Sequence, residues 1–258
     1  MPDVTEAAAG TTPVERAATL ERLATWDFCG IGLHPGGSNY VFVGRLQPPG
    51  TEPGDDDADQ IFTIYKPSAG ERPLRDFPFG TLHRRELTAY VLSEALGWPL
   101  APPLVVREGP HGEGSVQLFI EHDTSSNYFT MRNDCLDKFA PVAMFDVLVH
   151  NADRKGGSCL RDAQQRIWAI DHGLTFNEYA RRRTVMFEFN GDPYPQDLMA
   201  RLAEVRREME HGQALARQLG GLIGDDEVGD LAARADAMID SGKYPVLDPH
   251  INVPYPFI

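Results

Sequence analysis

The sequence predicts an α+β protein in two lobes, the first rich in β-strands and the second mainly helical. Short apolar runs between Gly- and Pro-rich turns dominate residues 26–120, whereas apolar residues at helical spacing dominate after Glu121. The 258 residues suffice to bury a sizeable core as one domain. We expect a flexible tail at 1–12, a first lobe at 13–122 and a second lobe at 123–258.

The first lobe is expected to begin with a helix and then to follow the order β-β-β-α-β-β. Pro13 suits the first turn of a helix, and Gly97 suits the end of one. The Gly-rich stretch 34–39 lies between two short apolar-rich runs, which indicates a hairpin. The predicted helices cover 13–25 and 83–97, and the predicted strands cover 28–33, 40–46, 61–66, 104–108 and 115–120.

The second lobe is expected to contain one buried apolar helix, a small hairpin and two amphipathic helices. Gly220, Gly221 and Gly224 are expected to separate the two amphipathic helices. The predicted helices cover 134–151, 195–219 and 226–241, the hairpin covers 158–170, and a Pro-rich tail from Tyr244 is expected to lie extended.

The charge balance excludes some classes of partner. The chain has 38 acidic and 24 basic residues, a formal net charge of −14, so nucleic acid and anionic membrane surfaces would repel it. The three cysteines are widely spaced, which argues against a disulfide framework and against a Cys-based zinc site. The N-terminus lacks the apolar region of a signal peptide, and no apolar stretch reaches the length of a membrane helix. We therefore expect a soluble cytoplasmic protein.

Two aspartates are expected to meet at the base of a cleft between the lobes. Asp153 lies in a polar loop after the apolar helix, and Asp171 follows the small hairpin. Because a hairpin brings its two ends together, Asp171 should lie close to the loop that carries Asp153. Paired carboxylates of this kind serve phosphoryl transfer, in which one positions the acceptor hydroxyl and the other holds a metal ion.

The order of these features resembles the protein-kinase-like fold: a Gly-rich hairpin, a strand lysine, a helix glutamate, a polar loop, a β-hairpin and Asp-x-Gly. The sequence has no GxGxxG, VAIK, HRD or APE motif. Its loop NADRKGGSCL and its element IDHG are similar to the atypical branch of phosphatidylinositol 3-/4-kinase-like and HipA-like proteins. Within that branch, YKPSAGERPLRDFPFGTLHRRELTAYVLSEALGW resembles an actinobacterial phosphatidylinositol 3-/4-kinase-like family. The resemblance covers about residues 25–245 and implies a two-lobed kinase-like fold.

The resemblance implies a nucleotide site in the first lobe. Lys66 would contact the α- and β-phosphates, and Glu86 would hold Lys66 forward, with Glu94 as the rival partner. Residues at the junction of the lobes, including Phe119 and Ile120, would offer backbone groups to the adenine. The predicted nucleotide-binding residues are Gly36, Gly37, Ser38, Asn39, Lys66, Glu86, Glu121 and His122.

The resemblance also assigns roles in the second lobe. Asp153 would orient the acceptor hydroxyl or accept its proton, and Arg154 and Lys155 would offset charge on the transferred phosphate. Asp171 would bind the metal ion. Ser158 stands where this branch usually has asparagine, so either Ser158 or Asn151 would complete the metal site. Arg181, Arg182 and Arg183 follow at the place of the substrate segment and suit an acidic or phosphorylated group, although a solvated turn explains them equally well.

These features predict a phosphotransferase that uses ATP with Mg²⁺, or with Mn²⁺, and moves the γ-phosphate to a hydroxyl. The alternative is a pseudokinase that binds nucleotide as a sensor or scaffold, which Ser158 favours. A third interpretation is an unrelated α+β protein without a nucleotide site. The acceptor stays open between a protein, including the chain itself, a small metabolite and a lipid, and the charge of −14 counts against an anionic bilayer.

Overall fold

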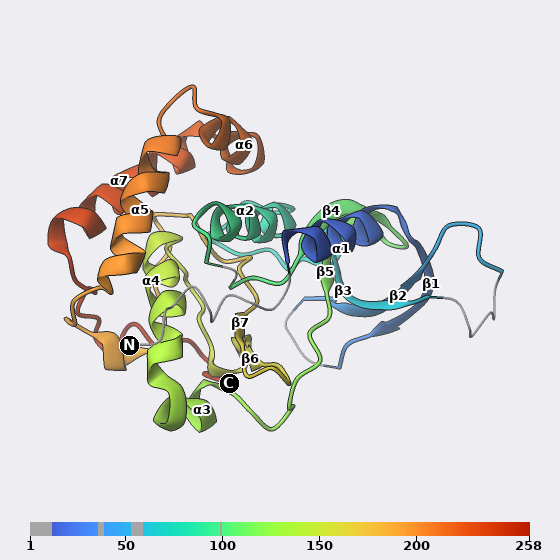
Figure 1. Cartoon of the computed structure of the whole chain (residues 1–258), viewed down its shortest axis with the longest axis horizontal. Coiled ribbons are helices and arrows are strands. Elements are labelled where there is room, and N and C mark those ends of the chain that lie inside the picture. The colour runs from blue at the N-terminus through green and yellow to red at the C-terminus, as the bar shows by residue number, and fades with distance from the viewer. Residues whose placement is uncertain (1–11, 36–38, 53–58, 99) are drawn as a thin grey trace.

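The computed structural model describes residues 12–35, 39–52, 59–98 and 100–258. A five-stranded antiparallel sheet and two helices form one half of the molecule, and helices dominate the other half (Figure 1). The α+β class and the two-part arrangement agree with the sequence-based prediction. The exact lobe limits, 13–122 and 123–258, stay a prediction.

The sheet has the strand order β1-β2-β3-β5-β4, with every neighbouring pair antiparallel. Helix α1 packs on β4 and β5, and helix α2 packs on the same two strands. The elements of this half are α1 (Pro13–Thr25), β1 (Asp27–Leu33), β2 (Phe42–Gln47), β3 (Ile61–Pro67), α2 (Leu82–Ala95), β4 (Leu104–Gly109) and β5 (Gly112–Leu118). All the strands and helices predicted for this half are present, with ends that differ by at most three residues.

The helical half contains α3 (Tyr128–Cys135), α4 (Ala140–Leu148), the hairpin β6 (Cys159–Arg161) and β7 (Ile167–Ala169), α5 (Gln196–Glu208), α6 (Ala214–Ile223) and α7 (Asp225–Ser241). From Tyr244 onward the chain forms no helix or strand. The predicted hairpin is therefore confirmed, whereas the tail, which was expected to lie extended, has turns at 249–251 and further bends.

Two helix predictions were wrong in their limits. The expected helix 134–151 is only α4, which follows the end of α3 and a short 3-10 turn, because Cys135 has φ −150° and ψ 45° and Pro141 lies in the first turn of α4. The expected helix 195–219 ends at Glu208, and Gly212 with φ 88° turns the chain into α6. Gly220 and Gly221 lie within α6, and only Gly224, with φ 91°, separates α6 from α7.

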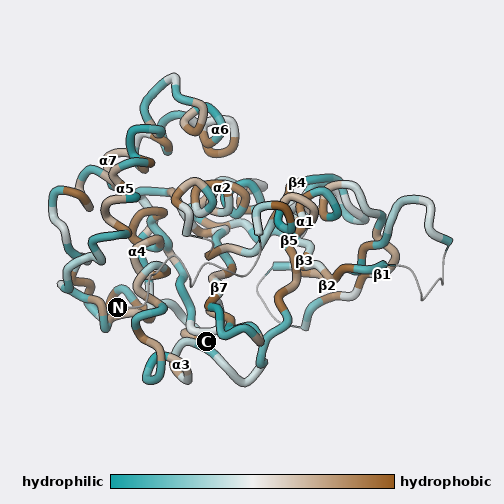
Figure 2. Tube along the Cα trace, in the orientation of Figure 1, coloured by the Kyte–Doolittle hydropathy of each residue, from teal (hydrophilic) through white to brown (hydrophobic). Residues whose placement is uncertain are grey.

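Helix α2 belongs to the core of both halves. Its residue Leu92 and the following Leu96 are fully buried in one apolar cluster with Phe145 of α4, Leu202 of α5 and residues of α6 and α7, and its Tyr90 is buried with Leu104 of β4. The sheet has its own smaller cluster around Leu46, Tyr65 and Val116. Apolar stretches accordingly occur along the strands as well as on the helices (Figure 2). Burial on both sides fixes α2, which carries Glu86, against the helical half.

No helix within the described part of the chain combines the length and the apolar character needed to cross a membrane.

Candidate active site

Lys66 forms the centre of the site. It lies on β3, and its Nζ donates to Glu86 Oε1 on α2 at 2.6 Å and to Asp171 Oδ1 after β7 at 2.7 Å. The side chain of Glu86 is 7% exposed, whereas that of Asp171 is 54% exposed and open to a ligand. The predicted ion pair between Lys66 and Glu86 is therefore present. Its rival Glu94 pairs instead with Arg16 of α1.

The charges of Lys66, Glu86 and Asp171 shift one another's pKa values. The Lys66 ammonium holds the pKa of Asp171 down at about 2, although burial opposes this effect. Burial alone would lower the pKa of Lys66, but the carboxylates of Asp171 and Glu86 outweigh it and raise that pKa. Burial raises the pKa of Glu86, and the attraction of Lys66 opposes the rise. Lys66 thus stays a cation and Asp171 an anion at neutral pH.

Helix α2 is held in position by partners outside it. The Glu71 carboxylate accepts from the backbone N–H groups of Leu82 and His83, which would otherwise be unpaired in the first turn. Arg85, 3% exposed, donates to the carbonyl of Thr175 and to Glu227 of α7. These bonds lock the helix that carries Glu86 to the helical half.

Asp153 lies in the loop after α4, and Asn151 shapes that loop. The Asn151 Oδ1 accepts from the Asp153 backbone N–H at 2.8 Å, and its Nδ2 donates to Asp146 at 2.9 Å. Asn151 is 1% exposed, and both ends of its amide are used inside the loop. The structure thus gives Asn151 a positioning role toward Asp153, and its predicted part in the metal site stays a prediction.

Arg154 also differs from its predicted role. Its side chain is fully buried and forms a two-pronged ion pair with Asp146, at 2.7 Å and 2.9 Å. Its remaining N–H groups donate to the carbonyls of Ser158 and Ile170 and to His172 Nε2. With every donor satisfied in the interior, Arg154 cannot contact a transferred phosphate. Its predicted contact with that phosphate is wrong, and it ties the Asp153 loop to the Asp171 segment instead.

Lys155 turns the other way from Arg154, since its Nζ lies 3.3 Å from Asp153 Oδ2 and both side chains are about a third exposed. Burial raises the pKa of Asp153, and the nearby charges of Lys155 and Arg183 only partly reverse the rise. A carboxylate with a raised pKa is a better proton acceptor than a free aspartate.

Asp171 and Ser158 meet at the end of the small hairpin. Asp171 has φ 60°, an uncommon conformation for a residue with a side chain, and Ser158 Oγ donates to its Oδ2 at 3.4 Å. A half-exposed carboxylate beside a hydroxyl is an oxygen-donor set that suits Mg²⁺, which binds few protein ligands and takes the rest from phosphates and water. The donor set therefore fits the predicted metal.

The remaining predicted nucleotide contacts are only partly described. Asn39 Oδ1 accepts from the Arg72 backbone, and Gly36, Gly37 and Ser38 lie outside the described residues. Glu121 and His122 lie between β5 and α3, at the junction where they were expected. The His122 ring is within hydrogen-bond distance of the Ile120 carbonyl, at 2.7 Å.

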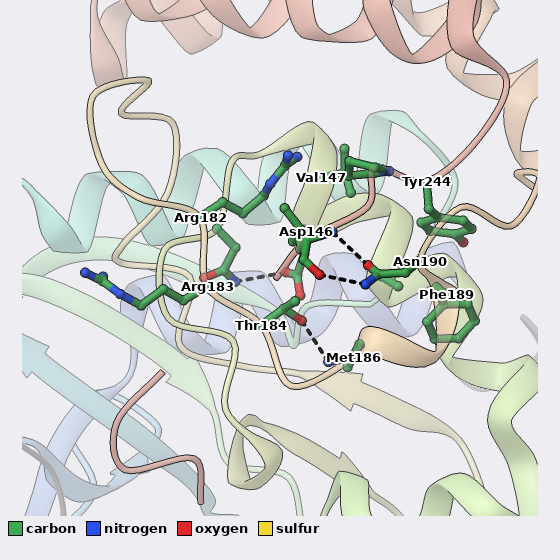
Figure 3. A pocket seen from close by; sticks show the side chains of 13 residues that line it. Asp146, Val147, Arg182, Arg183, Thr184, Met186, Phe189, Asn190 and Tyr244 are labelled. Carbon is green, nitrogen blue, oxygen red and sulfur yellow. Dashed lines mark hydrogen bonds between the residues drawn. The ribbon is translucent and has the colours of Figure 1, made fainter. Parts of the chain in front are cut away.

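A small cavity lies behind the Asp153 loop, and residues 182–190 form one of its walls (Figure 3). Its volume of about 30 Å³ has room for one or two water molecules. Asn190, on this wall, donates to the Leu247 carbonyl, and the tail residue Asn252 donates to the Arg182 carbonyl. The tail thus fixes the segment that runs beside the loop.

Sequence reasoning missed Asp146, which pairs with both Arg154 and Asn151 although it is 4% exposed. A signal was available, because Asp146 is a lone acid within the apolar run AMFDVLV. A carboxylate on a buried helix needs a partner, so the presence of Asp146 in this run predicts a buried cation beside it.

This chain is similar to several known proteins, among them one sequence relative and two solved structures. Protein Rv2133c of Mycobacterium tuberculosis is 34% identical over 231 residues, which cover 76% of this chain and 82% of that protein. The Golgi casein kinase with Mn/ADP bound matches 90% of this chain and 76% of its own, with a TM-score of 0.55 and 13% identity. Hydra Fam20 with sugar matches 90% and 89%, with a TM-score of 0.50 and 11% identity. No protein-family model matches the sequence. The two structures share the kinase-like fold with this chain.

Proposed function

The chain belongs to the family of Protein Rv2133c and has a kinase-like fold, and on this premise we propose that it is an ATP-dependent phosphotransferase. The observation that carries the proposal is the Lys66 ammonium held between Glu86 and the half-exposed carboxylate of Asp171. A fixed cation beside a metal-binding carboxylate is the arrangement that kinases use to hold nucleotide phosphates. The finer likeness to phosphatidylinositol 3-/4-kinase-like proteins is part of the proposal and rests on the motifs around Asp153 and Asp171.

In this proposal Lys66 contacts the phosphates, and Asp171 with Ser158 holds Mg²⁺ or Mn²⁺. When bound, the nucleotide would supply the γ-phosphoryl group, and the metal ion would supply positive charge that offsets the charge on the phosphate oxygens. That the Golgi casein kinase was solved with Mn/ADP supports a divalent metal with the nucleotide. The backbone around residues 36–39 and the junction at Glu121 and His122 are proposed to contact the nucleotide.

Asp153 is proposed to act on the acceptor. Its backbone is fixed by Asn151, and its side chain is about a third exposed. The carboxylate would orient the acceptor hydroxyl and accept its proton, for which the raised pKa is suited. Lys155, 3.3 Å away, would offset charge on the phosphoryl group during transfer.

One observation favours a second candidate, a nucleotide-binding pseudokinase. The hydroxyl of Ser158 beside Asp171 is neutral and short, so it would hold a metal ion less firmly than a charged or longer ligand. This candidate keeps the roles of Lys66 and Asp171 and removes the role of Asp153.

Incubation with γ-labelled ATP and Mg²⁺ or Mn²⁺ separates the two candidates. The phosphotransferase predicts label on protein or on added hydroxyl compounds, reduced at least about a hundredfold in Asp153→Ala. Asp197→Ala, at an exposed site in the first turn of α5, is the matched control and should keep the label. Thermal stabilisation by Mg–ATP without any transfer would support the pseudokinase.

A further inference from the structure

Residues 182–184 run alongside the Asp153 loop and are hydrogen-bonded to it. The Arg154 N–H donates to the Arg183 carbonyl at 3.0 Å, and the Arg183 N–H donates to the Asn151 carbonyl at 3.2 Å. Arg154 and Thr184 form a parallel bridge, and the Thr184 N–H donates to the tail residue Asn252. The backbone on both sides of Arg183 is therefore fixed against the loop that presents Asp153.

The Arg183 side chain lies beside the loop that carries Asp153. Its Nη1 donates to the carbonyl of Ala152, next to Asp153, at 3.3 Å, and its charge acts to lower the pKa of Asp153. Figure 3 shows the side chains of Arg182 and Arg183 extending in different directions, that of Arg182 upward and that of Arg183 to the left. Arg182 instead lies near Tyr194 and Glu178. Of the two, Arg183 is therefore the arginine that contacts the Asp153 loop and whose charge acts on Asp153.

The cationic group of Arg183 has spare capacity. A guanidinium has five N–H donors, and in the described part of the chain Arg183 uses one of its side-chain groups, toward Ala152. No ion pair in the described residues includes Arg181, Arg182 or Arg183, although the chain has 38 acidic residues. The Asp153 carboxylate is already paired with Lys155. Arg183 is thus not needed to pair that carboxylate, and it can bind an anion from outside.

We propose that the acceptor carries a phosphate or carboxylate group near its hydroxyl and that Arg183 binds this group. Arginine is suited to this task because its planar fork matches the oxygens of both groups. With the anion on Arg183, the hydroxyl would be directed to Asp153 on the same stretch of loop. The inference rests on the proposed function for the identity of the acceptor site, but the anion site can be measured without catalysis.

Calorimetric titration tests the site with matched probes, glycerol 3-phosphate, glycerate and neutral glycerol. We expect the anionic probes to bind at least about tenfold more tightly than glycerol, as a charge-assisted pair provides. Arg183→Gln should remove this preference, and Arg183→Lys should keep part of it. Arg207→Gln, at an exposed site on α5, is the control and should behave as the wild type. Thermal melts of each variant establish that it is folded.

The outcomes separate this inference from the proposed function. Anion binding that depends on Arg183, in a protein that transfers no phosphate, keeps the anion site and overturns the phosphotransferase. If the protein transfers phosphate equally well to neutral and anionic acceptors, and Arg183→Gln does not change these rates, the anion site is overturned and the phosphotransferase is kept. A pair of serine peptides flanked by Glu or by Gln then tells whether the anion belongs to a protein or to a small molecule.

Discussion

Replacement of Arg154 by methionine should lower the unfolding free energy of the protein and not only the rate of its reaction. Arg154 is fully buried, and the carboxylate of its partner Asp146 has a side-chain exposure of 6%. Removal of one member leaves a buried charge without its partner, which costs about 3–5 kcal/mol of unfolding free energy. For a chain of this size the melting temperature should fall by about 10 °C.

Chemical denaturation and thermal melts measure this loss without any knowledge of the substrate. Arg154→Met combined with Asp146→Asn removes the buried charge as well, so the double variant should lose less stability than the two single losses added together. Arg207→Met, at an exposed site on α5, should change the unfolding free energy by less than about 0.5 kcal/mol. An Arg154→Met protein within about 1 kcal/mol of the wild type would refute the structural role and restore the predicted contact with phosphate.

Three further results are expected. Burial and the charge of Arg154 hold the pKa of His172 well below 6.5, so the folded state keeps this ring neutral. The contribution of this group to the unfolding free energy is complete above pH 6.5 and decreases as the pH falls below 6.5, by at most about 1.4 kcal/mol per pH unit. Denaturation of His172→Gln at a series of pH values should show a smaller decrease. An unchanged slope would contradict the assignment. Arg85→Met should leave Glu227 unpaired, and because α2 is then held less firmly, nucleotide binding should weaken. Titration with ATP measures this affinity. An unchanged affinity would mean that α2 is held by packing alone. A Cβ at Gly156 would lie 2.8 Å from the Phe129 ring, so Gly156→Ala should lower the melting temperature, and an unaltered melt would show that the ring moves freely.

The sequence predicted the elements that have strong local patterns. Helix α2 has regular apolar spacing and Gly97 at its end, and its limits were nearly correct. Helix α3 was missed because its main signal is a capping box at Asn127 and Thr130, with few apolar residues in regular spacing. The break before α4 was hidden because the apolar pattern continues through it, and Pro141 is the one local sign of a helix start.

In the site, predictions succeeded where fold order decides the contact and failed where side-chain direction decides it. Lys66 and Glu86 are 20 residues apart on a strand and a helix that must pack together, so their pairing follows from topology. Asp153, Arg154 and Lys155 are adjacent in sequence, yet Arg154 points into the core and Lys155 toward solvent. Only the buried Asp146, which is eight positions earlier, explains that direction.

Nucleotide binding tests the central claim most directly. Calorimetric titration with a non-hydrolysable ATP analogue, with and without Mg²⁺, would compare the wild type with Lys66→Met, Asp171→Asn and the control Lys243→Met, an exposed lysine after α7. We predict Mg²⁺-dependent binding in the wild type and the control, at least about tenfold weaker binding in Lys66→Met, and loss of the Mg²⁺ dependence in Asp171→Asn. Equal binding in all four proteins, or none in the wild type, would contradict a nucleotide site between Lys66 and Asp171.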